Sequence, residues 1–136
     1  MEVAAARTFV ERNHRAVLAT RRSGGGIQMS PVMAGVDAEG RVIISSTEPT
    51  AKVRNLRRDH RASLCILTDR FFGGWAQMDG TAEIVSLPEA LELLVDYYRR
   101  VAGEHPDWDE YRQAMQDQRR VILRIDIERA GPDRQG

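Results

Sequence analysis

Alternation of apolar and polar residues marks six segments of this chain as half-buried β-strands. The alternation is clearest near the C-terminus, where Leu123, Ile125 and Ile127 are separated by charged residues. Glycine, proline and other turn residues bound the segments. The predicted strands cover residues 15–21, 27–36, 41–47, 62–69, 75–85 and 119–129. Pro31 interrupts the second of them, which predicts a sheet edge or a bulge at that position.

Apolar residues at helical spacing predict helices over residues 3–13 and 89–101. A short helix is expected from Thr50, which follows Pro49 and can act as its N-cap, to about residue 58. Residues 86–89 (SLPE) and 107–110 (DWDE) have the pattern of capping boxes, in which two side chains bond the unpaired N–H groups of a helix start. The second box predicts a fourth helix, from residue 107 to about residue 116.

The order of these elements indicates the class of fold. Three consecutive strands, a short helix and two further strands favour a small antiparallel barrel. The chain has too few strand–helix–strand units for a parallel doubly wound sheet. No repeat and no long linker divides the sequence. We therefore predict a mainly β fold with peripheral helices, a six-stranded antiparallel barrel in a single domain over residues 1–136.

The composition excludes several classes of protein. The chain has 136 residues, 42% of them hydrophobic, and its 20 basic and 20 acidic side chains give a formal net charge of zero. This balance argues against a general nucleic-acid binder or a membrane-surface protein. The single cysteine, Cys65, allows no disulfide framework and suits a reducing cytoplasm. No apolar run is long enough for a membrane span and no signal peptide is recognisable, so we expect a cytoplasmic protein.

The charges are nevertheless unevenly distributed. Residues 52–61 carry five positive charges and one negative charge, whereas residues 104–117 carry five negative charges and one positive charge. The two stretches could attract each other within a chain or between subunits, and part of the basic one could bind an anionic ligand. Of the 20 basic residues, only Lys52 is a lysine.

Familiar catalytic motifs are missing from the sequence. It has no GxGxxG, P-loop, CxxC, HExxH or nucleophile elbow. The three histidines, His14, His60 and His105, are far apart in the chain, so we expect no metal site. Cys65 lies in the apolar run SLCIL and is predicted to be a small core residue. We therefore predict no catalytic acid, base or nucleophile among the side chains.

The segment from Ser45 to Asn55 has a pattern that suits an anion. Small hydroxyl residues end a strand, a proline turns the chain, and a helix begins near Thr50 with Lys52 and Arg54 in its first turn. The N-terminus of a helix favours anions and disfavours cations. A lysine at this position therefore suggests a bound phosphate, although a solvated helix with a chance lysine would have the same sequence.

Several stretches resemble one known family. ISSTEPTAKVRNLRRDHRASLCIL (residues 44–67) resembles the signature of the pyridoxamine-phosphate-oxidase-like split β-barrel flavoproteins. RAVLATRRSGGGIQMSPV resembles their first hairpin, and GWAQMDGTAEI resembles a later strand. The tail GEHPDWDEYRQAMQDQRRVILRI is similar to an actinobacterial branch that uses the deazaflavin coenzyme F420. The resemblance covers roughly residues 15–127 and implies a split β-barrel of the FMN-binding type.

The resemblance also implies cofactor-binding positions. Those along the ring system or at its edge are Gln28, Ser30, Pro31, Ser45 and Ser46. Those around the phosphate and the acidic tail are Thr50, Ala51, Lys52, Arg54 and Asn55, with Lys52 as the phosphate ligand. Trp75 is implied to come from the partner subunit's side of the groove. The family often has a basic residue two places before the lysine, where this chain has Thr50.

The activity implied is hydride transfer from reduced coenzyme F420 to an unsaturated substrate such as a quinone, an enone or a tetrapyrrole. The cofactor would supply the chemistry, which agrees with the absence of a catalytic side-chain motif. The implied assembly is a homodimer with a cofactor groove at each side of the interface. Three alternatives remain at this stage: an FMN-binding protein, a deazaflavin carrier without turnover, and a dimeric interaction module. FMN ends at its phosphate, whereas F420 has an anionic tail for which the basic stretch would be a landing surface.

Overall fold

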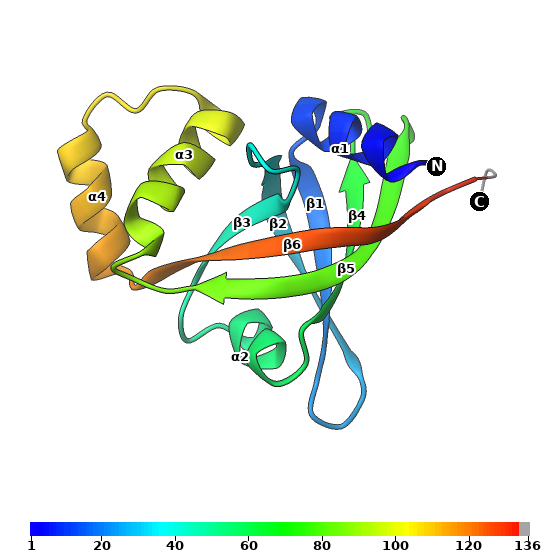
Figure 1. Cartoon of the computed structure of the whole chain (residues 1–136), viewed down its shortest axis with the longest axis horizontal. Coiled ribbons are helices and arrows are strands. Elements are labelled where there is room, and N and C mark those ends of the chain that lie inside the picture. Colours follow the sequence, from blue (N-terminus) through cyan, green and yellow to red (C-terminus); the bar gives the residue numbers. More distant parts are fainter. Residues whose placement is uncertain (134–136) are drawn as a thin grey trace.

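Six antiparallel strands close on themselves in the order β1-β2-β3-β6-β5-β4, as the computed structural model in Figure 1 shows for residues 1–133, the residues that the structure describes. The strands are β1 Arg15–Arg21, β2 Ile27–Val36, β3 Val42–Thr47, β4 Arg61–Leu67, β5 Trp75–Val85 and β6 Arg120–Gly131. Each neighbouring pair is antiparallel, including β1 with β4, which closes the barrel. The predicted fold class is confirmed.

Within the described part of the chain, four helices surround the barrel: α1 Val3–Arg12, α2 Ala51–Arg58, α3 Ala90–Ala102 and α4 Trp108–Asp117. Figure 1 shows α1 and α2 on opposite sides of the strands. It also shows α3 beside α4, near the C-terminal end of β5 and the start of β6. Apolar side chains of α1 and α2 join the barrel core, among them Val10 and Leu56. Helices α3 and α4 form a second core with Ile43 and Ile122, which lie on β3 and β6. None of the four helices is long and apolar enough to cross a membrane.

The two predicted capping boxes differ in outcome. The Asp107 side chain accepts a hydrogen bond from the Glu110 N–H at 3.1 Å, which confirms the cap, whereas the Asp107 N–H donates to His105 Nδ1 at 2.9 Å and not to the Glu110 side chain, so only half of the box forms. The prediction for Ser86 is wrong, because its Oγ contacts the Arg57 guanidinium at 3.3 Å and no side chain caps α3. Three turn residues separate Ser86 from the start of α3 at Ala90, so its hydroxyl lies too early in the chain to reach the helix's first N–H groups.

Cys65 also differs from its prediction. Leu64 and Ile66 point into the barrel, where they are buried, and alternation along a strand therefore turns Cys65 outward. The thiol lies on the outer face of β4, partly exposed, and burial against its neighbours raises its pKa. An apolar run in the sequence does not reveal which of its members faces the core.

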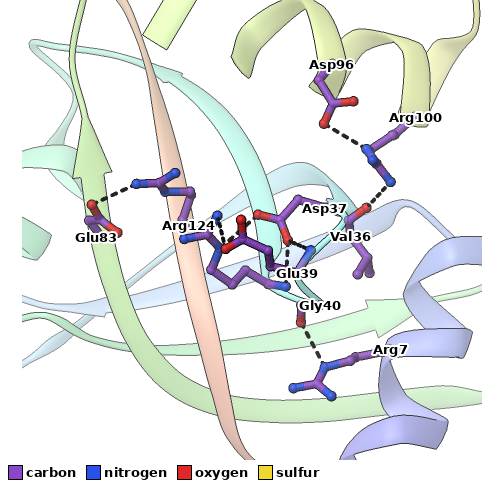
Figure 2. Close-up of polar contacts among 10 residues, drawn as sticks. Arg7, Val36, Asp37, Glu39, Gly40, Glu83, Asp96, Arg100 and Arg124 are labelled. Atoms are coloured by element: carbon purple, nitrogen blue, oxygen red, sulfur yellow. Dashed lines mark hydrogen bonds and ion pairs between the residues drawn. The ribbon is translucent and has the colours of Figure 1, made fainter. Parts of the chain in front are cut away.

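A network of polar contacts holds the turn between β2 and β3 (Figure 2). One carboxylate oxygen of Asp37 accepts hydrogen bonds from the N–H groups of Glu39 and Arg41, each at 2.9 Å. The other oxygen accepts from the Arg41 guanidinium at 2.9 Å. Arg7 and Arg100 tie the turn to α1 and α3 through backbone carbonyl oxygens, both at 2.8 Å. The hairpin is thus anchored to two helices at the point where β2 and β3 begin to pair.

We expect an Asp37→Asn variant to lose about 1 kcal/mol of stability at neutral pH, because its charge-assisted bonds to Arg41 are weakened. Burial opposes ionisation of Asp37, but the N–H groups and the guanidinium outweigh it and hold the pKa below the ordinary value of 3.8. The stabilisation is therefore present above pH 3.8 and is lost as the pH falls through the lower pKa of the folded state. Urea unfolding of both proteins from pH 7 to pH 2 measures this. A stability difference that does not shrink at acid pH would contradict the assignment.

Candidate functional site

The barrel opens between β2 and β3. The two strands pair only over three positions, Ala34 with Ile44 and the two pairs nearer the turn. Beyond these positions β2 pairs with β1 alone and β3 pairs with β6 alone. A groove of about 650 Å³ lies at this split, and it is lined by β1, β2, β3, the start of α2, Tyr97 of α3 and Arg120 of β6. Pro31 lies on the part of β2 that pairs on one side only, so the predicted edge is confirmed and no bulge occurs there.

The groove contains two close cations without a counter-charge. Lys52 is partly buried, and this burial, together with the positive charge of Arg120, lowers the pKa of its ammonium group. Neither side chain forms an ion pair within residues 1–133, and no acidic residue lines the groove. A buried charge without a partner is costly, so a bound anion would relieve both the burial and the repulsion. The groove is therefore suited to a phosphate or a carboxylate.

Hydroxyl groups and helix donors lie beside these cations. The Oγ atom of Ser46 is 3.0 Å from the Oγ1 atom of Thr50, which donates to the Thr47 carbonyl at 2.9 Å. Thr50 is the N-cap residue of α2 as predicted, but its side chain does not cap the helix. The first-turn N–H groups of α2 therefore lack a side-chain acceptor and can donate to an anion.

Tyr97 joins the two strands where they separate. Its hydroxyl donates to the Met33 carbonyl of β2 at 2.8 Å. Burial raises the pKa of Tyr97, while a hydrogen bond from the Ser45 N–H of β3 acts in the opposite direction. The phenol is buried and lines the groove, so one hydroxyl from α3 sets the spacing of β2 and β3 at this point.

A Tyr97→Phe variant should lose about 1–2 kcal/mol of stability, because the Met33 carbonyl and the Ser45 N–H both lose a buried partner. Tyr98→Phe is a matched control, since the Tyr98 hydroxyl has no hydrogen bond to the described residues. Urea unfolding at neutral pH compares the two variants. Equal stabilities of the two would show that the hydroxyl of Tyr97 does not hold the strands.

Comparison with known proteins identifies the family. The sequence model of the pyridoxamine 5'-phosphate oxidase family matches residues 3–132. The chain belongs to this family.

Solved structures agree with the family assignment. The conserved hypothetical protein Rv2991 from Mycobacterium tuberculosis is 28% identical, with a TM-score of 0.77 over 96% of this chain and 82% of that protein. A structure named F420 reductase is 18% identical, with a TM-score of 0.72 over 92% of this chain and 94% of its own. An FAD-binding protein from Mesorhizobium loti is 17% identical, with a TM-score of 0.64 over 96% and 92%. The last two similarities concern the fold.

Within this family fold, the groove brings together five of the predicted site residues. They are Pro31, Ser45, Ser46, Thr50 and Lys52. Ala51 is the first residue of α2, directly beside this set, and Arg54 is exposed on the same helix. Trp75 lies elsewhere, in a hollow formed by β5 and β6, so within one chain it does not line the groove.

Three further predicted residues lie on the interior side. Asn55 is buried and donates to the Thr20 hydroxyl at 3.1 Å, and the Thr20 hydroxyl lies 3.3 Å from the Gln28 side-chain oxygen. Ser30 is on the same face of β2 as Gln28, and its Oγ is buried with no partner in the described structure. The Asn55–Thr20–Gln28 chain of hydrogen bonds fixes α2 to the barrel. The Ser30 hydroxyl, in contrast, remains available to a ligand on the part of β2 that pairs only with β1.

Two residues at the centre of the site were not predicted from the sequence. Tyr97 lies in the predicted helix of residues 89–101 and Arg120 in the predicted strand of residues 119–129, and the sequence singled out neither of them. Both are far from Lys52 in the chain, and barrel closure brings them to the groove. No local pattern marks either of them, because their role depends on which strands pair.

Proposed function

We propose that this protein is a cytoplasmic oxidoreductase that binds coenzyme F420 in the groove and transfers a hydride to a small unsaturated substrate of the quinone, enone or tetrapyrrole class. The observation that carries the proposal is the pair of uncompensated cations, Lys52 and Arg120, at the start of α2. A phosphate there would accept bonds from Lys52 and from the first-turn N–H groups of the helix. The family assignment and the F420 reductase of similar fold support the choice of cofactor class.

The remaining residues of the groove suit a flat ring. Val17, Pro31 and Met33 provide an apolar wall on β1 and β2, and the Ser45 and Ser46 positions provide polar atoms on β3. When bound, the reduced deazaflavin would supply the hydride. The chain's own residues would hold the phosphate, fix the ring between β2 and β3 and keep water from its buried face. The proton that completes the reduction would come from solvent or from a hydroxyl group of the groove, whose lining contains no carboxylic acid or histidine.

We further propose that a second copy of this chain covers the outer face of the barrel next to the groove. Alternate residues of β2 point outward, and three of them are large, apolar and exposed: Ile27 at 45%, Met29 at 66% and Met33 at 45%. A shallow apolar hollow of about 160 Å³ beside Met29 is lined in part by Val17 and Cys65. Large exposed apolar patches commonly mark interaction sites. Met33 also lines the groove, so a partner on this face would complete its wall and could bring its own Trp75 to it.

A Met29→Glu variant is expected to be monomeric, because a charge would be placed in the centre of the proposed apolar interface. Sedimentation velocity at micromolar concentration measures the change. Gln116→Glu, an exposed position on α4, adds the same charge away from this face and should leave the assembly unchanged. A wild-type protein that sediments as a monomer would overturn the proposed dimer, as would a Met29→Glu protein that remains dimeric.

Cofactor titration tests the functional proposal. Purified protein is titrated with oxidised F420 and with FMN, and binding is followed by absorbance and fluorescence. We expect tighter binding of F420, because its anionic tail can reach Arg54, which is exposed on α2 next to the groove, whereas FMN ends at its phosphate. Reduced F420 is then tested with quinones, enones and tetrapyrroles. Tighter binding of FMN would replace the proposal by an FMN-binding protein, and binding without turnover of any substrate would leave a carrier.

A further inference from the structure

Four arginines converge on a second hollow at the opposite end of α2. Arg21 and Arg22 come from the end of β1 and its turn, Arg58 is the last residue of α2, and Arg61 begins β4. This hollow, the arginine pocket, has a volume of about 540 Å³ and shares no lining residue with the groove. Lys52 and Arg58 lie about 9 Å apart along the helix axis, at a rise of about 1.5 Å per residue. The two hollows are therefore separate sites.

The positive charge of the arginine pocket is largely uncompensated. Its lining contains one carboxylate, Asp59, and Arg61 occupies both oxygens, with Nε at 3.0 Å from one and Nη2 at 2.7 Å from the other. Within residues 1–133, Arg21, Arg22 and Arg58 form no ion pair with a carboxylate. Three of the four arginines that line this concave space therefore have no ion-pair partner of their own among the described residues, and its one carboxylate is bonded to Arg61.

One of these guanidinium groups is already held in place. Arg58 donates to the Arg21 carbonyl at 2.7 Å and to the Asn55 side-chain oxygen at 3.2 Å. Asn55 is itself buried and bonded to Thr20. Both acceptors of Arg58 are neutral, so they orient the guanidinium group without cancelling its charge. A ligand that binds here has less side-chain entropy to lose than one that binds a mobile arginine.

We propose that the arginine pocket binds a compact oligoanion, a small ligand with two or more phosphate or carboxylate groups, independently of the cofactor groove. Guanidinium groups match both kinds of anion through paired N–H donors. Several guanidinium groups around one space favour a ligand with several charges over a single carboxylate. The hollow has the volume usual for small-molecule sites. A long polyanion is disfavoured, because the chain as a whole has a formal net charge of zero.

Isothermal titration calorimetry of the full chain with tripolyphosphate, with citrate and with acetate tests the proposal. We expect tripolyphosphate or citrate to bind with an affinity that falls as salt is added, and acetate to bind far more weakly. Arg22→Gln and Arg58→Gln should each weaken oligoanion binding about tenfold or more, the usual effect of losing a charge-assisted hydrogen bond. Arg22 has no side-chain hydrogen bond within the described structure, so its variant keeps the test valid if Arg58→Gln folds poorly.

Two controls separate this site from the groove. Lys52→Ala should bind the oligoanion as the wild type does, and so should Arg12→Gln, an exposed arginine on α1. The titration is repeated with FMN and with F420 at saturating concentration, and the affinity should not change. Failure of both oligoanions to bind would overturn the proposal, as would equal affinity in Arg22→Gln. Loss of binding in Lys52→Ala, or displacement by either cofactor, would also overturn it, because the anion would then occupy the groove or its extension.

Discussion

Cofactor binding is expected to weaken by about 1.5–3 kcal/mol, roughly 10- to 150-fold, when Lys52 is replaced by alanine. The ammonium group has no ion-pair partner within residues 1–133 and lies beside Arg120, so a phosphate would be its principal bonding partner. The folding of the protein without cofactor should be unaffected or slightly improved, because the variant removes a charge that burial and Arg120 disfavour. Fluorescence titration measures the affinity, and urea unfolding measures the stability.

The pH dependence of binding gives an independent check. Burial and Arg120 place the pKa of Lys52 below its ordinary value of 10.5. Only the charged form attracts a phosphate, so wild-type affinity should fall as the pH rises through this lowered pKa. Lys52→Ala should lack this alkaline decrease, and the Arg12→Ala control should retain it. Unchanged affinity in Lys52→Ala would mean that the groove does not bind a phosphate through this residue.

The largest loss of stability is expected from Gly80→Ala, at about 3 kcal/mol. The register of the β5–β6 pairing shifts between Asp79 and Gly80. A Cβ atom at this position would lie 2.1 Å from the Asp126 carbonyl oxygen and 3.0 Å from its carbon. Both atoms belong to the β6 backbone, so no side-chain rotation can relieve the clash. The two strands would have to separate at this point of the β5–β6 pairing.

Gly24→Ala is the matched control for this substitution. Gly24 lies in the turn between β1 and β2, and a Cβ atom there meets nothing within 4 Å. Urea unfolding should show little change for Gly24→Ala and a much lower midpoint for Gly80→Ala. A Gly80→Ala protein as stable as the control would show that β5 and β6 can shift apart at the bulge at little cost.

Local patterns predicted the elements of this fold well. Alternation located the six strands, and helical spacing together with cap and turn residues located the four helices, with ends that differ by a few residues at most. The cap at Asp107 was predictable because it depends on residues within one turn. Lys52 could be singled out for the same reason, because a positive charge is unfavourable in the first turn of a helix and this placement is visible within a few residues of sequence.

Tertiary structure decided the features that depend on contacts between distant segments. The pairing of β2 with β3 ends at Ala34 and Ile44, and this opens the groove to which Tyr97 and Arg120 come from far along the chain. The convergence of arginines from β1, α2 and β4 has the same origin. Periodicity and capping patterns involve only a few neighbouring residues. The sequence by itself therefore determined the strands, the helices and the start of α2, which suits an anion. Strand pairing and barrel closure join segments tens of residues apart, and they alone determined which side chains share a groove and which face the interior.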